Sequence, residues 1–215
     1  ENPNGAKVLF AWHWLSGTAN QAFRYMELED ITAGDDVIVV APDSDGSQYE
    51  WHFADEQTDN PDLLLFDDLL SCLWQQYNVD LDGVHSFGMS AGGLWTTYLT
   101  LYRSAWLAST APLSGGVLPG SYSSPADPIP VLITWGGDSD SYGSLSFNDA
   151  STYLSERLRD DGHFVAECEH DDGHQLPPGG VEYAYRFLMD HPKGVTPEPY
   201  ADGLPSSFPA WCRLP

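Results

Sequence analysis

Ser90 lies in the segment G-M-S-A-G, which follows an apolar run and precedes a helix-like stretch. A G-x-S-x-G pattern between a strand and a helix is typical of a nucleophilic serine on a sharp turn, which pushes the hydroxyl away from the backbone. Gly88 and Gly92 fit this interpretation because side chains there would collide with the adjoining strand and helix. The alternative is a serine in an ordinary tight turn, since a chain rich in Gly and Ser contains this short pattern by chance.

A serine hydroxyl becomes a nucleophile when a base takes its proton, and an acid must orient that base. In sites built on this turn, the chain order is serine, then acid, then histidine. His174, in D-G-H-Q-L-P, follows the last expected strand and is the predicted base. The other histidines, His170 apart, precede Ser90, open a strand or follow the last helix.

His170 is the local competitor, and it raises a second possibility. It lies four residues before His174, with Asp171 and Asp172 between them. On a helix this spacing would suggest a metal site, but Gly173 and the position after a strand predict a loop. No third ligand is evident, so we predict neither a metal nor an organic cofactor.

The acid is expected directly after the strand at residues 129–135. Asp138 and Asp140 both qualify by position, in W-G-G-D-S-D. A turn rich in Gly, Ser and Asp is also an ordinary loop, so one of the two is expected only to form the turn. Position alone leaves the choice between them open.

An ester-cleaving site also needs backbone N–H groups that are already in place for the oxyanion. The residue after the nucleophile, Ala91, is predicted to supply one of them. The loop after the first strand should supply the other, from Leu15 or Trp14.

Three tryptophans, Trp14, Trp51 and Trp135, fall at or near strand ends that are expected to face the site. A flat acyl group or a polymer chain could lie on such side chains, so we predict that they bind substrate. The alternative is that they pack in the core or in loops. No insertion is long enough for a separate lid domain, which predicts an open cleft.

Apolar runs alternate with helix-like segments along the chain, which predicts an α/β fold with a mostly parallel sheet covered on both faces. In such sheets, sites form outside the carboxyl ends of the strands, where every candidate above is expected. The predicted strands are residues 7–12, 36–41, 84–87, 107–113, 129–135 and 164–168, and the predicted helices are residues 19–30, 61–77, 91–102, 147–161 and 181–189.

Composition limits the range of functions. The 215 residues predict one domain, with an extended tail from about residue 192. A net charge of −24 argues against nucleic acid as a partner, and no apolar run is long enough to span a bilayer. Cys72, Cys168 and Cys212 allow three disulfide pairings, and a bridge would suit an extracytoplasmic protein. The chain opens at Glu1 without a signal-like segment or an initiator Met, so we expect a chain that was trimmed at a mature or an artificial boundary. We also expect a monomer.

Four segments are similar to the motifs of one family. Residues 12–19 (W-H-W-L-S-G-T-A) are similar to L-H-G-C-x-x-T-A, and residues 77–93 to Y-x-[IV]-D-x-x-R-V-[YH]-x-x-G-M-S-x-G-G. Residues 137–140 align with G-T-x-D, and residues 173–177 match G-H-x-x-P. The sequence therefore resembles, over nearly its whole length, the alpha/beta-hydrolase esterases grouped with secreted polyhydroxybutyrate depolymerases and the related feruloyl and acetylxylan esterases.

This resemblance implies an alpha/beta-hydrolase fold and a serine esterase mechanism. It favours Asp140 over Asp138 as the acid and places Leu15 at the residue whose N–H binds the oxyanion. The sequence departs from the family at Gly83, where Arg is usual, and at Trp14, which replaces the Gly of the H-G pair. Glycine gives that loop conformational freedom, so Trp14 bears directly on the geometry of the oxyanion loop.

We therefore predict a secreted or periplasmic serine esterase with Ser90, Asp140 and His174 as the triad and polymeric or aromatic esters as substrates. The alternatives are a peptidase or small-molecule hydrolase on the same fold, because a fold does not fix a substrate. A protein that binds polysaccharide or polyester without catalysis is the alternative from another class.

Overall fold

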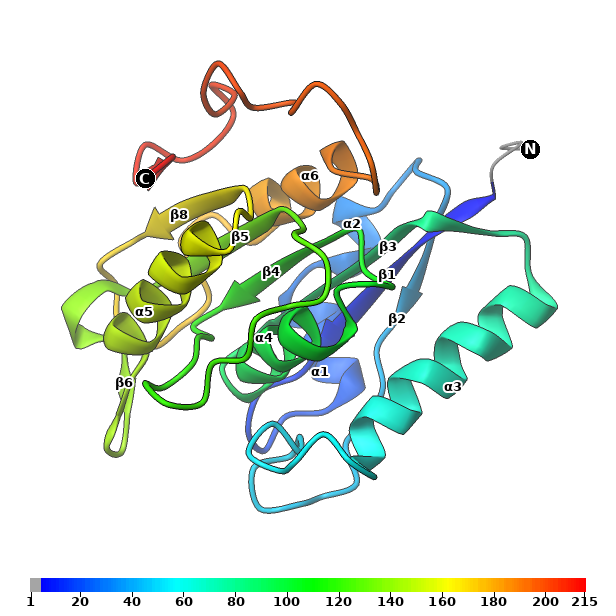
Figure 1. Cartoon of the computed structure of the whole chain (residues 1–215), viewed down its shortest axis with the longest axis horizontal. Helices are drawn as coiled ribbons and strands as arrows, with labels where there is room; N and C mark the ends of the chain where they lie inside the picture. Colours follow the sequence, from blue (N-terminus) through cyan, green and yellow to red (C-terminus); the bar gives the residue numbers. More distant parts are fainter. Residues whose placement is uncertain (1–4) are drawn as a thin grey trace.

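A single mixed sheet organises the chain in the computed structural model, which describes residues 5–215. The sheet has seven strands in the order β2-β1-β3-β4-β5-β8-β9, and all neighbours pair in parallel except β8 and β9. This confirms the predicted class, a mostly parallel sheet with helices on both faces (Figure 1). The strands of the sheet are β1 (Ala6–Trp12), β2 (Val37–Val40), β3 (Val79–Met89), β4 (Ser109–Leu113), β5 (Val131–Trp135), β8 (Val165–Glu169) and β9 (Cys212–Arg213).

The alternating side chains of the strands divide the core into two layers. On β1, Val8, Phe10 and Trp12 belong to one layer, while Leu9 and Ala11 belong to the other. The first layer packs against α3 (Pro61–Gln76), α4 (Ala91–Arg103) and α5 (Phe147–Asp160). The second packs against α1 (Ala19–Tyr25), α2 (Leu28–Ile31), α6 (Glu182–Asp190) and part of the tail. Strands buried on both sides explain the continuous apolar runs in the sequence.

Most predicted elements are present, and the differences have local causes. The helix expected over residues 19–30 is interrupted, because Glu27 takes a left-handed conformation (φ 51°) between α1 and α2. β5 begins at Val131, one residue after Pro130, which has no N–H for a ladder hydrogen bond. A short hairpin of β6 (Ser141–Tyr142) and β7 (Leu145–Ser146), which the sequence pattern does not predict, follows β5.

The tail returns to the sheet instead of only lying over the surface. β9 pairs antiparallel with β8, and Cys168 forms a disulfide with Cys212 across this pair. Of the three pairings that the sequence allowed, the structure has this one, and Cys72 is free and exposed. None of the helices in residues 5–215 is long and apolar enough to cross a membrane.

Candidate active site

Ser90 forms the sharp turn between β3 and α4. Its backbone has φ 59° and ψ −117°, a strained conformation for a residue with a side chain. Two backbone hydrogen bonds hold it, from the Ser90 N–H to the Leu113 carbonyl (2.9 Å) and from the Leu94 N–H to the Ser90 carbonyl (2.8 Å). The turn therefore presents the Ser90 hydroxyl at the carboxyl edge of the sheet.

The glycines around Ser90 permit a very close backbone approach. A Cβ atom at Gly92 would lie 2.2 Å from the carbonyl oxygen of Trp12, and one at Gly88 would lie 2.6 Å from the carbonyl oxygen of Gly92. Neither backbone atom can move without displacing β1 or α4. The G-x-S-x-G spacing thus follows from the packing of the turn against β1.

Side chains from three separate segments meet at Ser90. His174 Nε2 lies 2.8 Å from Ser90 Oγ, and His174 Nδ1 lies 2.6 Å from Asp140 Oδ1. The Asp140 carboxylate accepts a hydrogen bond from the Nδ1–H, so Nδ1 keeps its proton and Nε2 is free to accept the proton of the serine hydroxyl. The structure thus brings together Ser90, His174 and Asp140 in the arrangement expected of a nucleophile, a base and an orienting acid.

The position of the Asp140 carboxylate is fixed by three donors. Ser114 Oγ and the Gly136 N–H donate to Oδ2 at 2.7 and 2.8 Å, and His174 donates to Oδ1. Burial raises the pKa of the Asp140 carboxyl, but the hydrogen bonds from His174, Gly136 and Ser114 outweigh burial and lower the pKa below its ordinary value. Asp140 is therefore a buried carboxylate that stays ionised. Asp138 is exposed and contacts Asn148, away from His174.

The loops that carry the acid and the histidine are in direct backbone contact. The Gly173 N–H donates to the Gly136 carbonyl (2.9 Å), and the His170 N–H donates to the Trp135 carbonyl (3.0 Å). A Cβ atom at Gly136 would lie 1.9 Å from the carbonyl oxygen of Gly173, so only glycine fits there. Phe147, at the start of α5, stacks on the His174 ring with the centroids 4.4 Å apart.

The structure does not favour the metal interpretation of His170. His170 and His174 lie on a loop, and the buried His170 ring accepts a hydrogen bond from the Asp172 N–H (3.3 Å). Over residues 5–215, no three side chains of His, Cys, Asp or Glu form a group that could hold a metal ion.

Two backbone N–H groups are available for an oxyanion. Ala91 is the first residue of α4, and Leu15 lies in the loop after β1; neither N–H has an acceptor among the described residues. The next N–H along the loop, that of Ser16, already donates to Glu50 (2.9 Å). The left-handed residue of this loop is Ser16 (φ 61°), not Trp14, so the missing glycine at Trp14 imposes no strained φ. Binding of an oxyanion by Ala91 and Leu15 stays a prediction.

Buried aromatic side chains support the loop after β1 from below. The Trp51 indole donates to the His13 carbonyl (2.9 Å), and its ring packs on that of Trp12. His13 accepts a hydrogen bond from the Ser44 N–H at Nε2, so its Nδ1 carries the proton and donates to the Trp14 carbonyl.

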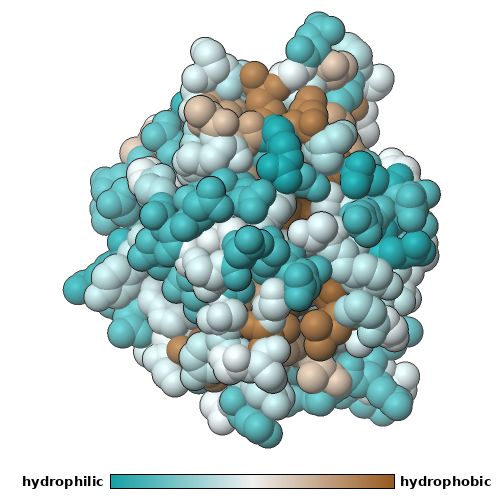
Figure 2. Space-filling view, turned by 90° about the vertical axis from the view of Figure 1, so that its left-hand side faces the viewer, coloured by the Kyte–Doolittle hydropathy of each residue, from teal (hydrophilic) through white to brown (hydrophobic). Residues whose placement is uncertain are grey.

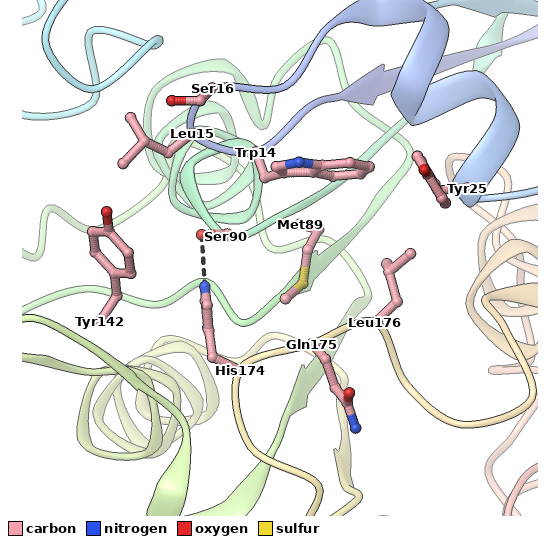
Figure 3. Close-up of a pocket in the computed structure, with 10 residues that line it drawn as sticks. All are labelled: Trp14, Leu15, Ser16, Tyr25, Met89, Ser90, Tyr142, His174, Gln175 and Leu176. Atoms are coloured by element: carbon pink, nitrogen blue, oxygen red, sulfur yellow. Dashed lines mark hydrogen bonds between the residues drawn. The ribbon is translucent and has the colours of Figure 1, made fainter.

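A cavity of about 540 Å³ opens at Ser90 (Figure 3). Trp14, Met89, Tyr25 and Leu176 lie on one side of the Ser90–His174 pair, and Leu15 and Tyr142 lie on the other. Ser16 and Gln175 complete the lining. A mostly apolar cavity with an activated hydroxyl suits an uncharged substrate with a polarised carbonyl group.

Trp14 lines this cavity as expected, but the expectation that Trp51 and Trp135 bind substrate is wrong. Their side chains are 1% and 2% exposed and belong to the core layer of α3, α4 and α5. Trp51 supports the His13 carbonyl, and Trp135 donates from its indole to Asn148 (2.8 Å). A position near a strand end does not determine whether a side chain points into the site or into the core.

Several residues of the site were not found from the sequence. Met89 and Gln175 adjoin Ser90 and His174 in the chain, which was a usable signal. Tyr25, Tyr142 and Ser114 come from other segments, and nothing in their local sequence places them near Ser90.

The order of the strands and helices defines an α/β-hydrolase fold. At the carboxyl edge of its sheet, a serine, a histidine and an aspartate are hydrogen-bonded to one another. The native form of pOPH has this fold, with a TM-score of 0.74 and 18% identity over 99% of this chain and 86% of that one. The Bacillus cereus carboxylesterase has a TM-score of 0.66 and 19% identity over 85% and 87% of the two chains. Esterase PE8 has a TM-score of 0.61 and 18% identity over 86% and 92%. No family model and no curated protein matches the sequence.

Proposed function

We propose that this protein is a serine carboxylic-ester hydrolase that works through an acyl-enzyme. The observation that carries the proposal is the continuous hydrogen-bonded series from Ser90 Oγ through both nitrogens of His174 to the buried Asp140 carboxylate. The esterases among the structures with the same fold are consistent with this proposal.

The reaction follows from these positions. His174 Nε2 takes the proton of Ser90 as Oγ attacks the ester carbonyl, and Asp140 stabilises the imidazolium that forms. The carbonyl oxygen becomes an oxyanion beside the N–H groups of Ala91 and Leu15. His174 then gives its proton to the leaving alcohol. Water attacks the acyl-serine by the same route, with its proton passing through His174 to Ser90, and releases the carboxylic acid.

The cavity lining supports polymeric or aromatic esters as the substrate class. Trp14 lies beside Ser90, and the exposed rings of Tyr25 and Tyr142 flank the opening on opposite sides. Aromatic rings of this kind offer flat apolar surface along which an acyl group or a polymer chain can lie. We propose a polyester such as polyhydroxybutyrate, or a feruloyl or acetylxylan ester, as the natural substrate.

The Cys168–Cys212 disulfide supports an extracytoplasmic location, because disulfides persist in oxidising compartments. We propose a secreted or periplasmic monomer.

The test is hydrolysis of a short-chain p-nitrophenyl ester by the wild type and by Ser90→Ala, with the exposed tail substitution Ser206→Ala as control. We expect the wild type and the control to hydrolyse the ester and to be labelled by a serine-directed phosphonate. Ser90→Ala should neither hydrolyse the ester nor be labelled. A wild type that neither hydrolyses the ester nor is labelled by the phosphonate would contradict the proposal and favour a binding protein. Faster cleavage of anilides than of matched esters would indicate a peptidase.

A further inference from the structure

The Glu50 side chain contacts the loop that carries Leu15, although Glu50 is not among the residues that line the catalytic cavity. Glu50 Oε1 accepts a hydrogen bond from the Ser16 N–H (2.9 Å), and Ser16 lines the cavity directly after Leu15 (Figure 3). We propose that Glu50 is a positioning residue, which holds this loop so that the Leu15 N–H is in place for the oxyanion. The proposal rests on the esterase function proposed above.

Leu15 and Ser16 are the two central residues of a tight turn. The Gly17 N–H closes the turn by donating to the Trp14 carbonyl (2.8 Å). Ser16 has φ 61°, whereas the φ of Leu15 is negative, which is the pattern of a type II turn. Such a turn favours glycine at its second central position, because a left-handed backbone is strained for a residue with a side chain. The turn therefore depends on contacts that hold Ser16 in this conformation.

Hydrogen bonds to the Trp14 carbonyl set the direction of the Leu15 N–H. This carbonyl accepts from the Gly17 N–H and from His13 Nδ1 (2.9 Å). The C=O and N–H of a trans peptide point in opposite directions, so the Leu15 N–H points away from both donors. Rotation of the next peptide, between Leu15 and Ser16, would shift the Leu15 backbone. The Ser16–Glu50 bond opposes this rotation, because it would turn the Leu15 carbonyl oxygen toward the Glu50 carboxylate.

Glu50 is itself held in a fixed position. Its backbone is also left-handed (φ 67°), and its N–H donates to the Ser47 carbonyl (3.0 Å) in a second tight turn. Its Oε2 accepts a hydrogen bond from the Ser44 hydroxyl, so both carboxylate oxygens have donors. The Ser44 N–H in turn donates to His13 Nε2 (3.2 Å). Strained residues that are fixed by several contacts are common at functional sites, where they set the position of other groups.

Packing from the core does not reach the end of the turn at Ser16. Trp51 supports the His13 carbonyl from the core, but Ser16 is exposed. The face that carries the carboxyl ends of the strands is largely hydrophilic, with separate hydrophobic patches (Figure 2). Hydrogen bonds must therefore hold this turn in contact with water. A bond from an N–H to a carboxylate is about twice as strong as one between neutral groups, so Glu50 suits this role.

Replacement of the carbonyl oxygen of the substrate by sulfur tests the proposal. The probes are a p-nitrophenyl ester and the thionoester with the same acyl and leaving groups. Sulfur accepts hydrogen bonds weakly, so N–H donors contribute less to cleavage of the thionoester. We expect wild-type kcat/KM to be higher for the ester than for the thionoester by about 10²-fold. The ratio of the two values does not depend on the concentration of active enzyme, so partial unfolding of a variant does not change it.

Glu50→Ala should lower kcat for the ester about tenfold, because the Leu15 N–H is displaced and not removed. The thionoester should be affected far less, so the ratio should fall. Glu50→Gln should retain the wild-type ratio, because its amide oxygen can accept the Ser16 N–H. If Glu50→Ala does not fold, Glu50→Asp should show the same fall in the ratio, because it keeps the charge and shortens the side chain by one methylene.

The matched control is Asp43→Ala. Asp43 also accepts from a backbone N–H of the facing segment, that of Ala19 (2.7 Å), but this contact lies at the start of α1, beyond the turn. The control removes the same charge and should leave the ratio unchanged. An equal loss on both substrates in Glu50→Ala, or the same fall in the ratio in Asp43→Ala, would overturn the role of Glu50 alone. A wild type that cleaves neither substrate would overturn the proposed function itself.

Discussion

The two sides of Ser90 are held in place by different forces. On the acid–base side, directional hydrogen bonds fix Asp140 and His174, and backbone groups of Gly136 and Gly173 are in contact. On the side that we propose for the oxyanion, called the oxyanion side below, the loop of residues 13–17 rests on buried aromatic rings, with Trp51 beneath it.

This difference reflects what each side must do. A proton moves along a defined line, so its carriers need hydrogen bonds that set direction and ionisation state. An oxyanion needs backbone N–H groups at a fixed position, and close packing beneath the loop can provide that rigidity. We therefore expect substitutions on the acid–base side to impair catalysis, and those beneath the oxyanion loop to impair stability first.

The largest effect is expected for the acid. Asp140→Asn should lower kcat by about 10⁴-fold, because an amide no longer fixes the tautomer of His174 or stabilises its charged form. Asp138→Asn should leave kcat nearly unchanged, since Asp138 contacts Asn148 and not His174. Steady-state kinetics on a p-nitrophenyl ester measure both. A large loss in Asp138→Asn would show that the acid is wrongly assigned.

The second largest effect is expected at the contact between the loop that carries Asp140 and the loop that carries His174. Gly136→Ala should lower kcat about 10²-fold, because the new Cβ would push the Gly173 backbone, and with it His174, by the order of an ångström. Thermal unfolding measured beside kcat separates misplacement from loss of fold. If kcat is unaffected, the loops are not coupled in the way their contact implies.

On the oxyanion side, Trp51→Phe removes the donor to the His13 carbonyl and keeps an aromatic ring. We expect the free energy of unfolding to fall by about 1–3 kcal/mol, because a buried acceptor is left unsatisfied. Because packing still supports the loop, kcat should fall by less than in Gly136→Ala. Urea unfolding and kinetics measure the two quantities. A loss of kcat as large as that of Asp140→Asn would contradict the expectation that substitutions beneath this loop impair stability before catalysis.

The smallest effect is expected for the stability of the protein at low pH. Because the folded pKa of Asp140 is lowered, its contribution to stability is fully present above the pKa of an unfolded Asp, about 3.9, and is lost as the pH falls through the lower folded pKa. The difference in unfolding free energy between the wild type and Asp140→Asn should therefore shrink on acidification in this window. Urea titrations at a series of pH values would measure it, and a difference that grows would contradict the lowered pKa.

Sequence reasoning located the three segments of the site because each follows a strand of a parallel sheet. Chain order and the Gly spacing pointed to Ser90 and His174, which the structure brings together. Position along the chain could not separate Asp138 from Asp140, because both lie on one turn. Of the two, only Asp140 is buried, and its burial depends on the contact of this turn with the His174 loop.

Other features were outside the reach of sequence patterns. Trp51 and Trp135 were misplaced because the direction of a side chain at a strand end depends on the pleat and on the helices above it. The strands of the β6–β7 hairpin are too short to show an alternating pattern. The partner of Cys212 depends on the path of the tail over the molecule, and that path is set by tertiary packing.

β9 has a consequence for the behaviour of the protein in concentrated solution. A free strand edge is a template onto which another chain can add by backbone hydrogen bonding, and this is a common route to aggregation. β9 covers that edge of β8 with only two residues, locked by a covalent bond, and Arg213 forms ion pairs with Glu167 and Glu169 beneath it. The outermost strand is thus too short and too charged to recruit a neighbour, and the sheet stops growing there.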